Sequence, residues 1–225
     1  MKTDYLEILS SIKNDINACN ESKNNDISLV IVTKSQGKEN ISKIINAGFK
    51  SLGENYVEEG IDKIKFFNDK SIEWHFIGNI QSNKIKKITH NFDWVQTISS
   101  IKHAKMINRA CEEALKKINI CIQINVDRET SKSGIYIEDL DNFIENILAL
   151  DRLVFRGLMA IPSKINALKE DTISYKILKS EYDRLKNKYK HIDTLSVGMS
   201  NDYKIAINNG SNMIRIGSLI FGERK

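Results

Sequence analysis

A lysine lies where a short apolar segment ends and a polar segment begins. Residues 28–33 are rich in β-branched and aliphatic side chains, and Lys34 is followed by the polar residues 35–38. A short apolar run bounded by turn-forming residues is typical of a buried strand, which places Lys34 at the mouth of a core. Partial desolvation there frees an amine to form a Schiff base. A lysine just past a strand is more often only a solvated strand end, so position alone does not decide.

A glycine and two small polar residues follow a later apolar run. Gly198 ends residues 194–198 and allows a sharp turn, so Ser200 or Asn201 is expected to be the N-cap of a helix that stops at Gly210. The free N–H groups and the dipole at a helix start attract phosphate. A plain N-cap without a ligand would explain the same pattern.

An arginine interrupts the last apolar run. Arg215 stands between two isoleucines within residues 212–217, so its side chain should point to the opposite side of the strand from theirs. A guanidinium in an apolar strand needs a partner, and either a carboxylate or a ring nitrogen would satisfy it. Gly217 and Ser218 then add N–H and hydroxyl donors for a phosphate at the end of the same strand.

Apolar runs and helical patterns alternate along the chain, after an amphipathic N-terminal helix. The expected strands are 28–33, 49–53, 73–77, 92–97, 119–126, 153–161, 194–198 and 212–217. The expected helices between them are 39–47, 56–67, 81–88, 100–117, 137–150, 167–190 and 201–209. Eight strands with a helix in each gap, in nearly the ~250 residues typical of such folds, predict a (β/α)8 TIM barrel with an extra N-terminal helix. We expect one domain over residues 1–225.

The unusual residues follow the predicted strands. Because the C-terminal ends of barrel strands converge on one face, these residues should share one site. Turns alone account for the glycines, but not for a lysine, an arginine and a serine on the same rim. The set comprises Lys34, Gly53, Glu54, Asn55, Gly78, Asn79, Thr97, Asn125, Met159, Gly198, Met199, Ser200, Arg215, Ile216 and Gly217.

Composition limits the possible functions. Basic and acidic residues number 34 and 29 and are interspersed, so the net charge of +5 is weak support for nucleic-acid binding. The three cysteines lack metal-ligand spacing and predict neither a disulfide framework nor a metal site. No segment has the apolar length of a membrane span or of a secretory signal, so a cytoplasmic protein is expected.

Ordered motifs over nearly the whole chain resemble the pyridoxal phosphate homeostasis proteins, single-domain relatives of the N-terminal barrel of alanine racemase. The motifs are VIVTK (30–34), GENYV (53–57), WHFIG (74–78), QSNK (81–84), SKSG (131–134), GLMAIP (157–162), GMSND (198–202), RIG (215–217) and FGER (221–224). The family often has threonine where this chain has Ser218, and often another residue where it has Asn79, to which we assign no role. His75, which lies between two aromatic residues, is expected to be a hydrogen-bonded core residue.

The resemblance implies pyridoxal 5'-phosphate as cofactor and a role for particular residues. It implies that Lys34 forms the Schiff base and that Asn55 lines the pocket. It further implies that Arg215 faces the pyridine nitrogen. The phosphate would be held by Ser200, Gly217 and Ser218. No catalytic residue is assigned.

Three functions remain open at this point. The resemblance favours a monomeric protein that carries or buffers the cofactor, with cofactor-dependent apoenzymes as possible partners and indirect effects on amino-acid metabolism. A slow racemase-like enzyme is the alternative, although an arginine opposite the ring nitrogen makes the ring a poorer electron sink. The second base of alanine racemase comes from a separate domain that is not expected here. In the third function, Lys34 is a simple charge in a barrel that binds another phosphorylated metabolite.

Overall fold

Eight parallel strands close into a barrel in sequence order. The computed structural model describes residues 5–20, 26–163 and 172–222. Each strand pairs with the next, and the last pairs with the first, as in a (β/α)8 barrel. The strands are β1 (Ser28–Val32), β2 (Ser51–Glu54), β3 (Glu73–Phe76), β4 (Trp94–Ile98), β5 (Ile118–Ile124), β6 (Leu153–Ala160), β7 (Thr194–Ser196) and β8 (Met213–Ile216).

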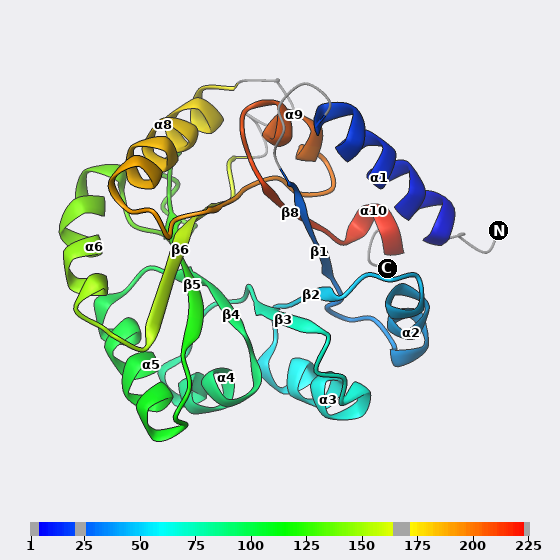
Figure 1. Cartoon of the computed structure of the whole chain (residues 1–225), viewed down its shortest axis with the longest axis horizontal. Coiled ribbons are helices and arrows are strands. Elements are labelled where there is room, and N and C mark those ends of the chain that lie inside the picture. Colours follow the sequence, from blue (N-terminus) through cyan, green and yellow to red (C-terminus); the bar gives the residue numbers. More distant parts are fainter. Residues whose placement is uncertain (1–4, 21–25, 164–171, 223–225) are drawn as a thin grey trace.

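Helices surround the strands, and α1 packs outside the barrel near α9 and α10 (Figure 1). The longer helices are α1 (Tyr5–Asn20), α2 (Lys38–Asn46), α3 (Val57–Phe67), α5 (Ile101–Glu113), α6 (Leu140–Leu148) and α8 (Ile173–Lys188). The shorter ones are η1 (Ser82–Lys84), α4 (Ile85–Asn91), η2 (Ile137–Asp139), α9 (Tyr203–Asn208) and α10 (Ser218–Phe221). Within the described ranges, no helix is both long enough and apolar enough to cross a membrane.

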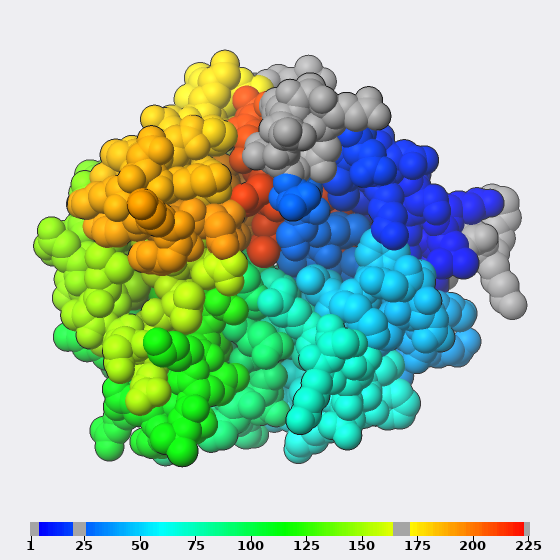
Figure 2. Space-filling view, in the orientation of Figure 1, coloured from blue at the N-terminus to red at the C-terminus, as the bar shows by residue number. Residues whose placement is uncertain are grey.

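The first and last strands of the barrel, β1 and β8, lie side by side. Ser28 pairs with Met213 and Ile31 with Ile216, which closes the barrel between β1 and β8. In the space-filling view, blue atoms from the start of the barrel lie beside red atoms from its end (Figure 2). This closure brings the residues that follow β1 next to those that follow β8.

Side chains alternate between two separate regions of the core. The larger cluster contains outward-facing residues such as Ile31 and Ile216, which pack against the helices. The smaller one lies inside the barrel and consists of Val30, Trp94, Cys121, Met159 and Met213. The apolar set inside the barrel is small because buried polar side chains fill much of the remaining space.

The main departures from the sequence prediction lie at element ends. The segment expected as one helix over 81–88 is a 3₁₀ turn followed by α4, and α10 was not predicted. Ser200 or Asn201 was expected to cap the helix after β7, which is wrong because Asp202 occupies that position. Asp202 accepts a hydrogen bond from the Met199 backbone N–H, and this contact closes the turn before the helix begins. The start of the helix expected over 167–190 lies outside the described residues.

Candidate functional site

Lys34 follows β1 on the strand's inward side. Val30 belongs to the cluster inside the barrel, and successive side chains alternate, so Val32 and Lys34 continue along the same side. Lys34 is half-buried. Ser35, directly after it, has a positive φ of 62°, so the chain turns sharply there. The sequence prediction of a lysine at the mouth of the barrel is consistent with this position.

Side chains from α3 hold backbone atoms on both sides of Lys34, and Glu54 of β2 holds the Thr33 side chain. Lys63 donates to the Thr33 carbonyl at 2.6 Å and to Glu54 at 2.7 Å, and both Lys63 and Glu54 are buried. The Thr33 hydroxyl also donates to Glu54, at 2.5 Å. Glu59 accepts from the Ser35 backbone N–H at 2.6 Å and from Lys63 at the same distance. These contacts fix the backbone that carries Lys34.

Burial affects the carboxyl group in this cluster. It raises the pKa of Glu54 above its ordinary value, and the nearby Lys63 ammonium and Thr33 hydroxyl only partly oppose this. Its Oε2 atom is buried without a hydrogen-bond partner among the described residues. Sequence reasoning missed this cluster, because Lys63 on an amphipathic helix looks like an ordinary surface lysine.

Asn55 follows β2, the strand next to the one that leads to Lys34. Val32 pairs with Gly53 in the β1–β2 register, so both residues follow the same end of neighbouring strands. The Asn55 Oδ1 atom is buried and has no hydrogen-bond partner in the described part of the chain. A buried amide oxygen without a partner is costly, so a ligand donor at this position would be favourable.

The turns after β7 and β8 meet at Ser200. Its hydroxyl oxygen accepts from the backbone N–H of Leu219 at 3.1 Å and of Gly217 at 3.4 Å. Gly217 packs so closely on β1 that a Cβ there would lie 3.1 Å from the Val32 Cβ. Ser218 is exposed at the start of α10. The three residues predicted to bind phosphate therefore lie together, close to the end of β1.

Arg215 is a buried cation inside the barrel. Its Nη1 donates to the Ser196 hydroxyl at 2.6 Å and its Nη2 to the Ala160 carbonyl at 3.0 Å. Among the described residues, it forms no ion pair with a carboxylate, so the salt-bridge alternative is not supported. Desolvation lowers the pKa of Arg215 to about 10, which keeps it charged at neutral pH. The two bonds to Ser196 and Ala160 use two of the five N–H groups of the guanidinium.

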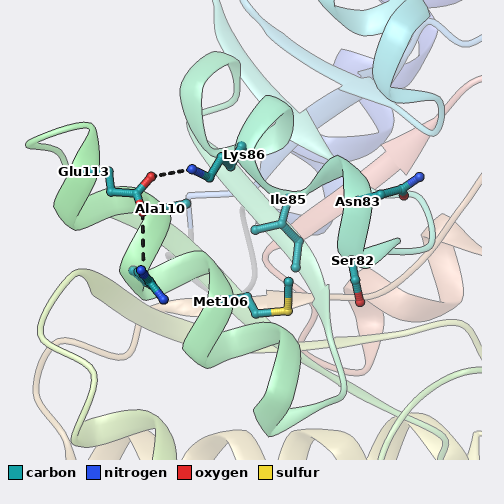
Figure 3. A pocket seen from close by; sticks show the side chains of 8 residues that line it. Ser82, Asn83, Ile85, Lys86, Met106, Ala110 and Glu113 are labelled. Carbon is teal, nitrogen blue, oxygen red and sulfur yellow. Dashed lines mark ion pairs between the residues drawn. The ribbon is translucent and has the colours of Figure 1, made fainter.

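A separate cavity of about 510 Å³ lies on the outside of the barrel, between the η1–α4 segment and α5 (Figure 3). Its basic side chains are already paired, because Glu113 contacts Lys86 at 2.7 Å and Arg109 at 3.5 Å. None of the strand-end residues discussed above lines it. We therefore assign no ligand to it.

Other chemistry finds little support in the structure. The described residues contain no cluster of His, Cys, Asp and Glu side chains suited to a metal ion. Burial raises the pKa of Cys111 to about 11 and of Cys121 to about 12, so both are poor nucleophiles at neutral pH. His75 is a fully buried, hydrogen-bonded residue as predicted, with Gln96 and Glu73 as its partners.

Comparison with known proteins places the chain in a family. The family described as alanine racemase, N-terminal domain matches residues 9–225. The pyridoxal phosphate homeostasis protein of Escherichia coli is 40% identical over 228 residues, which cover 98% of this chain and 97% of that protein. The corresponding protein of Buchnera aphidicola is 44% identical over 195 residues, 87% of this chain and 86% of that protein. The chain belongs to the pyridoxal phosphate homeostasis protein family.

Solved structures agree with this membership in the family. PipY of Synechococcus elongatus, without pyridoxal phosphate, is 26% identical and covers 97% of this chain and 100% of its own, with a TM-score of 0.88. The same protein with pyridoxal phosphate bound gives a TM-score of 0.85. An alanine racemase of Clostridium difficile shares the fold at 18% identity and a TM-score of 0.72, with 58% of its chain covered.

The residues at the mouth of the barrel fit the cofactor of these relatives. A phosphorylated pyridine aldehyde needs an amine, donors for the phosphate and a partner for the ring nitrogen. Lys34, the Ser200 turn and Arg215 supply these groups on neighbouring strands. The buried Asn55 oxygen, which has no hydrogen-bond partner in the described part of the chain, leaves a polar position for a ligand donor.

Proposed function

We propose that this protein binds pyridoxal 5'-phosphate and contributes to the homeostasis of the cofactor by carrying or buffering it. The observation that carries the proposal is Arg215, a cation buried inside the barrel that forms no ion pair with a carboxylate of the described residues and lies on β8, next to the strand that leads to Lys34. A buried charge without an ion-pair partner is costly unless other groups, such as those of a ligand, help to stabilise it. The membership in the family gives the ligand its chemical identity.

Each residue of the site has a proposed task. The Lys34 amine bonds the aldehyde carbon, and the carbonyl oxygen leaves as water, which gives a Schiff base. The hydroxyl groups of Ser200 and Ser218 and the N–H groups near Gly217 hold the phosphate. Arg215 donates to the ring nitrogen, and Asn55 accepts from the ligand. When bound, the cofactor supplies an electron-accepting ring, which Arg215 keeps weak because its guanidinium donates to an unprotonated nitrogen.

Further parts of the proposal concern the setting in which the protein works. We include a cytoplasmic location, a single domain over the whole chain, a monomeric state and transfer of the cofactor to apoenzymes. Sedimentation of the loaded protein tests the monomer. Mixing it with cofactor-free enzymes and measuring the recovery of their activity tests the transfer.

The central experiment locates the covalent bond. The protein should turn yellow with pyridoxal phosphate, and borohydride reduction followed by peptide mass mapping should place the adduct on Lys34. Lys34→Arg keeps the charge and should abolish the adduct. Lys38→Arg is the matched control, because Lys38 is exposed four residues further on and stacks over Phe66. An adduct on a different lysine, with colour kept in Lys34→Arg, would refute the assignment.

A further inference from the structure

A chain of hydrogen bonds runs through the inside of the barrel from Arg215. Arg215 Nη1 lies 2.6 Å from the Ser196 hydroxyl, which lies 2.7 Å from Gln96 Oε1. On the other side of the same amide, Gln96 Nε2 lies 2.9 Å from His75 Nδ1. His75 Nε2 lies 3.1 Å from the Glu73 carboxylate at the beginning of β3. Four strands contribute to the chain: β8, β7, β4 and β3.

The chemistry of its first member gives the chain one direction. Arginine can only donate, so Ser196 accepts from Arg215 and is left to donate its own proton to Gln96 Oε1. The Gln96 amide then presents its NH₂ group to His75 Nδ1, which must be an unprotonated acceptor. The proton of a neutral His75 therefore sits on Nε2, where it donates to Glu73.

The opposite orientation of the Gln96 amide satisfies fewer groups. Its NH₂ would then face Ser196, which would accept twice and have no acceptor in the chain for its own proton. Its oxygen would face His75 Nδ1, which would have to carry a proton. A neutral His75 would then turn an unprotonated Nε2 toward the Glu73 carboxylate, and two acceptors would face each other. Only the first orientation gives every one of these groups a hydrogen-bond partner.

The residues of this hydrogen-bond chain are buried, except for Glu73 at its outer end. His75, Gln96 and Ser196 have no solvent exposure, and Arg215 is 4% exposed. The Glu73 side chain is 44% exposed. His75 also stacks on Trp94, at 5.2 Å between ring centroids and 22° between planes, which fixes the ring. Polar groups this deep have few alternative partners, so each bond constrains the next.

We propose that Ser196, Gln96 and His75 are positioning residues for the ring nitrogen of the bound cofactor, an inference that rests on the proposed function. They fix the rotation of the Arg215 guanidinium, and with the Ala160 carbonyl they hold two of its nitrogens. The N–H groups that remain are thereby aimed at the ligand. Glu73 selects the His75 tautomer that makes this orientation possible.

The first test does not depend on the cofactor. In ¹⁵N-labelled protein without added ligand, the His75 signal, assigned by its loss in His75→Asn, should show a protonated Nε2 and an unprotonated Nδ1. A proton on Nδ1, whether His75 is neutral or charged, would overturn the proposed direction of the chain.

The second test separates positioning from general loss of structure. Ser196→Ala removes the hydroxyl that Arg215 uses, and Ser196→Thr keeps one. Ser196→Ala should weaken the binding of pyridoxal phosphate by about threefold to tenfold, which is part of what a hydrogen bond to a charged group contributes. The affinity for the 1-deaza analogue, which has carbon in place of the ring nitrogen, should change less than twofold. Ser196→Thr should restore binding.

Cys121→Ala is the matched control, because Cys121 is fully buried inside the same barrel and its side chain is not a member of the chain. It should affect the two ligands equally. Equal losses for both ligands in Ser196→Ala, or no loss for either, would overturn this inference and leave the proposed function in place. Failure of the unmodified protein to bind either ligand would overturn the proposed function, and the positioning role with it.

Discussion

Replacing Lys63 by methionine should destabilise the protein strongly, because it leaves the Glu54 carboxylate buried without its cation. The Lys63 amine lies 2.6 Å from both the Thr33 carbonyl and Glu59, and 2.7 Å from Glu54. The Lys63 and Glu54 side chains are only 5% and 0% exposed. Removing one partner of a buried ion pair costs about 3–5 kcal/mol, a large part of the roughly 5–15 kcal/mol that stabilises a typical domain.

The loss should depend on pH in a definite direction. Burial already raises the pKa of Glu54 in the folded protein, and removing Lys63 should raise it further. A carboxyl whose pKa is higher in the folded state than in the unfolded state holds its proton more tightly when folded. Stability therefore falls as the pH rises from the unfolded pKa, about 4.3, to the folded pKa. The unfolded pKa is the same for both proteins, so the deficit of Lys63→Met should widen as the pH rises from the folded pKa of Glu54 in the unmodified protein to its higher folded pKa in the variant, and narrow below that range.

Urea denaturation at several pH values measures the effect. The double variant Lys63→Met with Glu54→Gln should recover part of the loss, because the unpaired charge is gone. Lys50→Met is the control: Lys50 contacts Asp69 at 2.8 Å, but both side chains are more than a third exposed, so its loss should be much smaller. A change for Lys63→Met below about 1 kcal/mol at pH 7, with no dependence on pH, would refute the reasoning.

Three further changes test the site and the barrel. Ser200→Ala should weaken pyridoxal phosphate more than unphosphorylated pyridoxal, by about 1–3 kcal/mol, and equal losses in titrations of the two would count against the phosphate assignment. The loaded protein should convert L-alanine to the D-enantiomer at most slowly, because Arg215 keeps the ring a weak electron sink. Chiral chromatography measures this conversion. Conversion at ordinary enzyme rates that is lost in Lys34→Arg would favour a racemase. Gly157→Ala should cost about 3 kcal/mol or more, because φ is +151° and a Cβ would lie 1.8 Å from the Thr194 carbonyl oxygen. Thermal unfolding checks this against Gly37→Ala, which should be nearly neutral because nothing lies within 4 Å of its Cβ.

Much of the barrel could be predicted because its strands are short apolar runs that end in turn residues. Lys34 and Arg215 stood out for the same reason, since each is a cation where the pattern requires an apolar or turn residue. The order of the elements then placed them on one face without any knowledge of side-chain contacts.

The parts that could not be predicted depend on pairing between distant segments. Lys63 reads as a solvated helix residue until the β1–β2 register brings Thr33 and Glu54 against it. His75 was expected to be hydrogen-bonded. Its connection to Arg215 could not be predicted, because it runs through Gln96 and Ser196 on two further strands. The helix cap after β7 was predicted wrongly because the Ser200 hydroxyl accepts from the distant Gly217 and Leu219 N–H groups, and Asp202 stands at the N-cap position.

The pairing of β1 with β8 also governs when the pocket can exist during synthesis. Val30 pairs with Arg215, so one edge of β1 stays without a neighbouring strand until β8 has been synthesised. Until β8 has left the ribosome, Lys34 has neither Arg215 nor the Ser200 turn beside it. Contacts this distant in sequence form late and slowly. A nascent chain that still lacks β8 should therefore capture no cofactor.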